Sequence, residues 1–405
     1  MIFINQSVTD LFSNVVDALC QTDGPHFVIS GNRFKHWQNV KLLKCCMLQK
    51  HTPLRRIITW GLFTLQTFFW LLRHARNQHV LFVTNPPMAM WMAPFFKIHR
   101  GYRYSLLIYD IYPDALLVSG ILPETTLIGR LWRKMNALTL RRAENVITLG
   151  ERMAETLQGQ MPDGSKLEIA VIENWVDTDV FKPLSRSRNP IVQELGLENK
   201  FIVAYAGAFG ATHGIETILY CADMLKDHPN IHFLLVGSGT EENAVRKHIR
   251  ENTLTNLTLL PFQPRERFCH VAAAPDVSLV LLKTGGGRVS VPSKVYTALA
   301  SGTAVLAVAG ADSDLAASVM RHGYGRVIPP DDPKAMAGVI LLLARDPDLL
   351  SGLKTKAREI ALQFHARENQ CRKYRRLFHP LSIGFQKNDL MAPSTSSGNT
   401  ERLIF

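Results

Sequence analysis

Short apolar runs alternate with longer helical patterns along most of the chain. This alternation constrains the fold more than any other feature, because strand–helix–strand units place parallel strands in one sheet with helices on its faces. The polar stretch Lys182–Pro190 interrupts the pattern once. The sequence therefore predicts an α/β fold with two Rossmann-like, doubly wound domains facing a cleft. The expected strands are Phe27–Ser30, Val80–Thr84, Tyr104–Tyr109, Asn145–Leu149, Ile169–Ile172, Phe201–Ala206, Ile231–Val236, Leu257–Leu260, Val277–Leu281, Ala304–Val308 and Arg326–Ile328.

The expected domain boundaries follow from the same pattern. We predict an N-terminal domain at residues 1–182, a linker at 183–199 and a C-terminal domain at 200–365. A C-terminal helix is expected at 366–384, and the small, polar, aperiodic tail at 385–405 is expected to be disordered. Ligands of doubly wound sheets bind beyond the carboxyl ends of the strands.

Composition narrows the class of protein. Hydrophobic residues make up 46% of the chain and charged residues 20%, which is enough for sizeable cores and excludes a disordered chain. The net charge of +12 favours anionic partners such as phosphorylated substrates or an acidic membrane surface. The six cysteines include no C-x-x-C pair, which is typical of a reduced, cytosolic chain. The N-terminus lacks a signal-peptide pattern, and the apolar run Ile57–Leu72 is shorter than the roughly 20 residues that span a bilayer.

The segment between Asp23 and Asp110 holds no acidic residue, twelve Lys or Arg residues and many aromatic residues. Basic side chains beside an apolar helix face can bind an anionic bilayer, so we predict a peripheral membrane contact. The alternative is that the aromatic residues form a core and the charges a solvated face. Nucleic acid is not an expected partner, because no known binding module is recognisable. The residues expected to contact the membrane are Arg55, Arg56, Trp60, Trp70 and Arg73, with Arg76 as a further flanking cation.

Three glycine-rich turns follow predicted strands of the second domain. They contain Gly207, Gly210 and Gly214, then Gly237 and Gly239, and finally Gly285–Gly287. Glycines let the backbone approach a ligand, and the cations Lys283, Arg288 and Lys294 surround the third turn. The spacing is not G-x-G-x-x-G, so a nicotinamide cofactor is not implied. We interpret the turns as a diphosphate cradle; the alternative is a set of ordinary surface loops.

Several motifs together resemble the bacterial family-4 glycosyltransferases of capsule, lipopolysaccharide and exopolysaccharide synthesis. They are YDIYPD, RRAENVITLGERMAETL, IENWVDTDVF, AGAFGATHGIETIL, LLVGSGTEE and VPSKVYTALASGTAVLAV, and the resemblance covers roughly Leu81 to Phe364. It implies a GT-B fold, retaining stereochemistry, a nucleotide-diphosphate-sugar donor and an acceptor glycan on a polyprenyl diphosphate. The chain departs from the family pattern where Ala208 and His213 replace the usual donor-binding Arg and Lys, and where Val289 and Thr297 replace two Glu residues.

Candidate site residues follow from the motifs and the resemblance. Asp110 and Asp114 flank Tyr112-Pro113 after a strand end, where a carboxylate could orient or deprotonate an acceptor hydroxyl. For Asp114, helix capping is an equal alternative. The residues expected to bind the donor are Gly207, Gly210, His213, Gly237, Lys283, Arg288, Ser293, Lys294 and Thr297.

No metal or other cofactor is expected. The D-x-D of Asp177 and Asp179 and the Asp312-Ser313-Asp314 segment are interpreted as turn and helix-start chemistry, and the histidines are scattered. The leading hypothesis is a cytoplasmic glycosyltransferase at the inner face of the cell membrane. A non-catalytic scaffold of a polysaccharide synthesis complex and a nucleotide-sugar 2-epimerase remain as alternatives.

Overall fold

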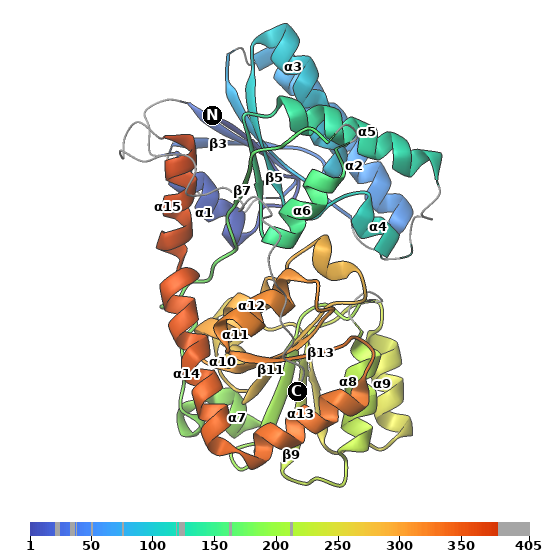
Figure 1. Cartoon of the computed structure of the whole chain (residues 1–405), viewed down its shortest axis with the longest axis vertical. Helices are drawn as coiled ribbons and strands as arrows, with labels where there is room; N and C mark the ends of the chain where they lie inside the picture. The colour runs from blue at the N-terminus through green and yellow to red at the C-terminus, as the bar shows by residue number, and fades with distance from the viewer. Residues whose placement is uncertain are drawn as a thin grey trace.

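A computed structural model of the chain describes residues 1–20, 25–32, 37, 39–49, 52–74, 77–118, 120, 126–161, 164–210 and 214–379. Two parallel β-sheets form two domains, which lie one above the other in Figure 1. This arrangement confirms the expected α/β architecture of two doubly wound domains. His213, Arg76 and the predicted tail at 385–405 lie outside the described residues.

The first sheet has seven strands in the order β3-β2-β1-β4-β5-β6-β7, and neighbouring strands are parallel. The strand β1 was not predicted, because three residues are too few to show a pattern; it lies inside the sheet and is completely buried. The strands are β1 (Ile2–Ile4), β2 (His26–Ser30), β3 (Val40–Lys44), β4 (His79–Val83), β5 (Arg103–Ile108), β6 (Asn145–Thr148) and β7 (Ile169–Val171).

Helices cover both faces of this sheet, because alternate residues of each strand point to opposite sides. Phe3 packs among residues of α1 and α15 on one face, whereas Ile4 packs among residues of α2, α3, α5 and α6 on the other. The helices of the first domain are α1 (Asp10–Leu19), α2 (Pro53–His74), η1 (Pro87–Met92), α3 (Ala93–Arg100), α4 (Asp114–Val118), α5 (Leu127–Arg142) and α6 (Glu151–Gly159).

The second sheet has six strands in the order β10-β9-β8-β11-β12-β13. Five of its strands have the bounds expected from the sequence, because fully buried parallel strands are continuous apolar runs. The strands are β8 (Phe201–Ala206), β9 (Ile231–Val236), β10 (Leu257–Leu260), β11 (Val277–Leu281), β12 (Ala304–Val308) and β13 (Gly325–Ile328). The helices before, between and after them are η2 (Arg186–Arg188), α7 (Pro190–Glu194), α8 (Ile215–Met224), α9 (Glu242–Glu251), α10 (Arg265–Ala272), η3 (Gly286–Arg288), α11 (Lys294–Ala300), α12 (Asp314–His322) and α13 (Pro333–Arg345).

The chain crosses between the domains a second time near its C-terminal end. Helix α14 (Pro347–Phe364) lies in the second domain, and α15 (Arg367–Phe378) returns to the first domain beside α1, as Figure 1 shows. The two crossings run together, because the backbone N–H of Val176 donates to the carbonyl of His365 at 3.0 Å. Within the expected linker, Ile191 of α7 packs into the core of the second domain.

Candidate functional site

The carboxyl ends of the two sheets meet between the domains. The loop after β5 touches the loop after β11: the backbone N–H of Ile111 donates to the carbonyl of Val289 at 2.9 Å, and Asp110 forms an antiparallel bridge with Ser290. This contact brings the YDIYPD motif of the first domain to the glycine- and lysine-containing loop of the second. Loops from both domains therefore meet where the sequence predicts the site.

Lys294, the first residue of α11, lies at the end of β8. Its ammonium group is 2.9 Å from the hydroxyl oxygen of Tyr205 and 4.0 Å from the centre of that ring. Burial lowers the pKa of Lys294 to about 7, since desolvation disfavours the charged amine. Within the described residues no carboxylate pairs with it. A partly buried cation without a counter-anion is suited to binding an anionic ligand.

The glycine turns pack tightly against this lysine and against each other. A Cβ atom at Gly207, whose φ is +158°, would lie 2.8 Å from the Nζ atom of Lys294. A Cβ at Gly237 would lie 1.8 Å from the carbonyl oxygen of Gly207, and one at Gly239 would lie 2.3 Å from that of Phe209. Packing alone therefore requires glycine in the turns after β8 and β9, whether or not a ligand also contacts them. Gly210 directly precedes the undescribed residues 211–213.

The remaining candidate donor-binding residues differ in their ion pairs and in their exposure to solvent. Lys283 is half-buried and has no ion-pair partner among the described residues, whereas Arg288 lies 3.6 Å from Glu155 and 3.5 Å from Asp312. Arg288 thus already has two carboxylates nearby, unlike Lys283, and its role in donor binding stays a prediction. Ser293 is exposed just before α11. Thr297 lies one helical turn after Lys294, and both residues line a small hollow of about 40 Å³.

The two candidate catalytic carboxylates have different surroundings. Asp110 is half-buried at the contact between the domains, and its backbone N–H lies 3.4 Å from the hydroxyl oxygen of Thr84. Asp114 pairs with Arg133 of α5 at 2.7 Å, and its other oxygen accepts a hydrogen bond from Gln160 at 2.6 Å. Both oxygens of Asp114 therefore hold α4 against neighbouring elements, through contacts other than the helix capping expected as its alternative role.

The expected membrane residues divide into buried and exposed groups. Trp60 is only 3% exposed and packs edge-on against Tyr112, so its predicted membrane contact is wrong. Arg56 is half-buried, lies 4.7 Å over the Trp60 ring and donates to the hydroxyl of Tyr112. Trp70 is also half-buried, against Phe27. Arg55 and Arg73 are exposed at the two ends of α2.

Three helices of the first domain share a broad apolar surface, of which the sequence predicted only the part on α2. We call it the α2/α3/α5 surface. Helix α3 contacts α5, and Phe95 of α3 packs against Phe68 of α2, so the three helices adjoin. No helix among the described residues is long and apolar enough to cross a bilayer. The exposed apolar residues of this surface are Leu54, Ile57, Ile58, Leu62, Leu65, Phe69, Phe95, Ile98, Leu127, Ile128, Leu131 and Leu138.

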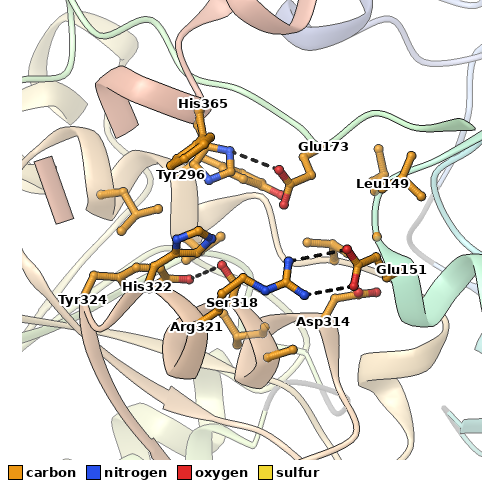
Figure 2. A pocket seen from close by; sticks show the side chains of 18 of the residues that line it. Leu149, Glu151, Glu173, Tyr296, Asp314, Ser318, Arg321, His322, Tyr324 and His365 are labelled. Atoms are coloured by element: carbon orange, nitrogen blue, oxygen red, sulfur yellow. Dashed lines mark hydrogen bonds and ion pairs between the residues drawn. The ribbon is translucent and has the colours of Figure 1, made fainter. Parts of the chain in front are cut away.

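A second hollow, of about 310 Å³, lies beside the two chain crossings and is lined by both domains (Figure 2). Burial raises the pKa of the Glu173 carboxyl and lowers the pKa of His365 to about 3, and their side chains approach to 3.8 Å. The rim of this hollow carries Glu151, Asp314 and Arg321. Sequence reasoning placed Asp314 at a helix start and missed its contact with the other domain.

The D-x-D segment forms a turn. The Oδ1 atom of Asp177 accepts hydrogen bonds from the backbone N–H groups of Asp179 and Val180, each at 3.2 Å. This Asx-turn geometry agrees with the turn chemistry expected for Asp177. Among the residues that the structure describes, no group of three or more His, Cys, Asp or Glu side chains is arranged to hold a metal ion.

Comparison with known proteins assigns a class. Residues 187–360 match the family model of the group 1 glycosyl transferases. The chain is 28% identical over 269 residues to the probable glycosyltransferase WbjE of Pseudomonas aeruginosa, covering 66% of each protein. It is 25% identical over 354 residues to the putative colanic acid biosynthesis glycosyl transferase WcaI of Escherichia coli K12, covering 84% of this chain and 85% of that protein.

Solved structures show the same two-domain fold. Sucrose-phosphate synthase from Thermosynechococcus elongatus superposes with a TM-score of 0.75 at 16% identity, covering 95% of this chain and 99% of the other. HepE of Anabaena, solved in complex with UDP-glucose, has a TM-score of 0.70 at 15% identity and covers 94% and 99%. The architecture is GT-B. Residues 187–360 form a glycosyl transferase domain, and the chain is similar over most of its length to two bacterial proteins named as glycosyltransferases.

Proposed function

We propose that the protein transfers a sugar, with retention and without a required metal, from a nucleotide-diphosphate sugar to a glycan carried on a polyprenyl diphosphate. The observation that carries this proposal is the amine of Lys294, which lies between Tyr205 and Gly207 and has no carboxylate partner among the described residues. A nucleotide-sugar diphosphate supplies the missing negative charge. UDP-glucose occupies the Anabaena neighbour, which makes a donor of this class the natural occupant here.

Lys294 takes over the donor-binding role of the arginine that Ala208 replaces. As the bond between the sugar and the phosphate breaks, negative charge grows on the leaving diphosphate, and a fixed ammonium group stabilises that charge. Lys283 is a second cation on the neighbouring loop without an ion-pair partner among the described residues. Thr297, one helical turn from Lys294, offers a hydroxyl where the family carries a Glu.

The acceptor binds mainly to the first domain. Asp110 lies at the carboxyl end of β5, directly against Ser290 of the donor domain. A carboxylate at this boundary orients the acceptor hydroxyl or takes up its proton during transfer. Asp114 is left out of this role, because both of its oxygens are already engaged.

The α2/α3/α5 surface gives the lipid-linked acceptor a route to the site. Exposed apolar side chains on adjoining helices mark a binding surface, and the cations Arg55, Arg73, Arg130 and Lys134 are exposed on α2 and α5. This combination fits the anionic inner face of a cell membrane, where apolar residues enter the interface and cations contact lipid headgroups. The protein is therefore proposed to be cytoplasmic and peripheral to that membrane.

Transfer assays with a lysine series test the donor site. The wild-type protein is incubated with a panel of nucleotide sugars and a lipid extract, and thermal stabilisation identifies the donor. We expect Lys294→Ala to slow transfer by roughly ten- to 150-fold, since a hydrogen bond to a charged group contributes about 1.5–3 kcal/mol. Lys226→Ala is the matched control, because this exposed lysine of the second domain is outside the predicted site and pairs with neighbouring Asp223. Near-normal rates in both Lys294→Ala and Lys283→Ala overturn the donor site, and nucleotide binding without transfer to any lipid favours the scaffold alternative.

A further inference from the structure

Helix α6 of the first domain begins without a cap of its own. Its N-cap residue is Gly150, which has no side chain to accept a hydrogen bond from the first turn. A helix start leaves its first N–H groups without partners inside the helix, and side-chain acceptors normally satisfy them. The acceptor for α6 comes instead from the second domain.

Asp314 supplies that acceptor across the boundary between the domains. Its Oδ1 atom accepts from the backbone N–H of Arg152 at 2.9 Å, and its Oδ2 atom accepts from that of Met153 at 3.2 Å. The carboxylate is not needed by its own helix, since the hydroxyl of Ser313 caps α12 by accepting from the N–H of Ala316. A negative charge at the start of α6 also matches the positive end of its dipole.

Gly150 leaves room for this carboxylate. A Cβ atom at position 150 would lie 2.2 Å from the Oδ2 atom of Asp314. The φ angle of Gly150 is −159°, an extended conformation that any residue adopts. Asp314 is therefore the obstacle to a side chain at this position, rather than the backbone of Gly150.

A second contact holds the same two helices. Arg321, two turns after Asp314 on α12, pairs with Glu151 of α6 at 3.0 Å, and Figure 2 shows this pair beside Asp314. Both side chains of the pair are well exposed to solvent, so this ion pair contributes less than the half-buried Asp314 cap. The strand β6 that leads into α6 neighbours β5, whose end carries Asp110.

We propose that Asp314 is a positioning residue that caps α6 from the opposite domain and thereby holds the two domains in the closed arrangement needed for transfer. It touches no reacting atom. It fixes the first domain, with Asp110, against the loop that carries Ser290 and precedes Lys294. The effect on turnover rests on the proposed transferase function, whereas the effect on domain closure does not.

Variants on both sides of the contact test the proposal in the full-length protein. The set is Asp314→Ala, Asp314→Asn, Gly150→Ala and the double variant Gly150→Ala/Asp314→Ala. Asp332→Ala is the matched control, because Asp332 caps α13 inside one domain by accepting from the N–H of Ala335 at 2.8 Å. Small-angle X-ray scattering measures the radius of gyration, calorimetry the donor Kd, and transfer assays kcat.

The expected result is a larger radius of gyration and a kcat lowered by about tenfold or more in Asp314→Ala and Gly150→Ala, with the donor Kd unchanged within about twofold. The double variant should have the same radius of gyration and kcat as Asp314→Ala, because the clash at position 150 is gone. Both quantities for Asp314→Asn should lie between those of wild type and Asp314→Ala. Asp332→Ala should lower only thermal stability. A wild-type radius of gyration in Asp314→Ala, or additive losses in the double variant, overturns the proposal. Absence of transfer in the wild type overturns the proposed function and leaves the scattering comparison valid.

Discussion

Donor binding should be coupled to the uptake of a proton by Lys294. Burial lowers the pKa of this lysine to about 7 in the free protein, where its amine lies 2.9 Å from the Tyr205 hydroxyl oxygen and forms no ion pair with a described carboxylate. A bound diphosphate favours the charged amine and raises the pKa again. Above pH 7 Lys294 is mostly neutral in the free protein, so the protein must take up a proton from solvent when the donor binds.

The magnitude follows from the pKa in the free protein. At pH 8 about one tenth of Lys294 is protonated, so binding should take up about 0.9 proton per site if the bound pKa is about 10 or higher. At pH 6 the free lysine is already charged and uptake should fall to about 0.1 proton. Between pH 7 and the bound pKa, the donor Kd should rise by about tenfold per pH unit.

Calorimetric titration of a nucleotide sugar in two buffers with different ionisation enthalpies measures this uptake directly. A nucleotide sugar is preferable to a free nucleoside diphosphate, whose terminal phosphate itself titrates in this range. Lys294→Met should abolish the uptake at pH 8, whereas Lys283→Met should retain it. Equal uptake at pH 6 and pH 8, or unchanged uptake in Lys294→Met, refutes the assignment of Lys294 to the diphosphate.

Three other predictions concern the metal, the membrane and the core. Transfer should persist in EDTA, and complete loss restored by manganese or magnesium would show that a metal site is required. The variant Leu127→Asp/Leu131→Asp should no longer sediment with vesicles containing anionic lipid, while Leu342→Asp/Leu362→Asp, which adds two charges at exposed leucines of the second domain, should still sediment. Equal binding by both variants contradicts the proposed membrane surface. Trp60→Ala should lower the free energy of unfolding by about 3–5 kcal/mol in denaturant titrations, because the side chain is 3% exposed; a loss below about 1 kcal/mol contradicts its place in the core.

The second domain was predictable because its strands are buried on both faces. Continuous apolar runs such as Phe201–Ala206 and Ala304–Val308 are local signals, and the structure keeps their bounds. The first domain was less predictable at β1 and β3, since Ile2–Ile4 is only three residues long and Val40–Lys44 mixes apolar residues with lysines. Short strands obtain their identity from the neighbours with which they pair.

Side-chain partners account for most of the remaining differences. Arg288 and Asp114 are residue types suited to binding and catalysis, but each already has ion-pair partners from elsewhere in the chain. Trp60 and Arg56 belong to the basic and aromatic segment, yet Tyr112 packs against the tryptophan and accepts a hydrogen bond from the arginine. Composition shows that such residues are present, but it does not show which of them face solvent.

The amino-acid sequence alone determined the α/β class, the two sheets, the glycine turns and the presence of Lys294 just after the third turn, because these features depend on residues close together in the chain. Tertiary structure alone decided which charged groups stay unpaired and which face of α2 reaches solvent. It also placed the Asp314 carboxylate on the first turn of α6, although Arg152 and Asp314 are 162 residues apart. Contacts over such distances depend on how the domains pack, and no local pattern of residues encodes them.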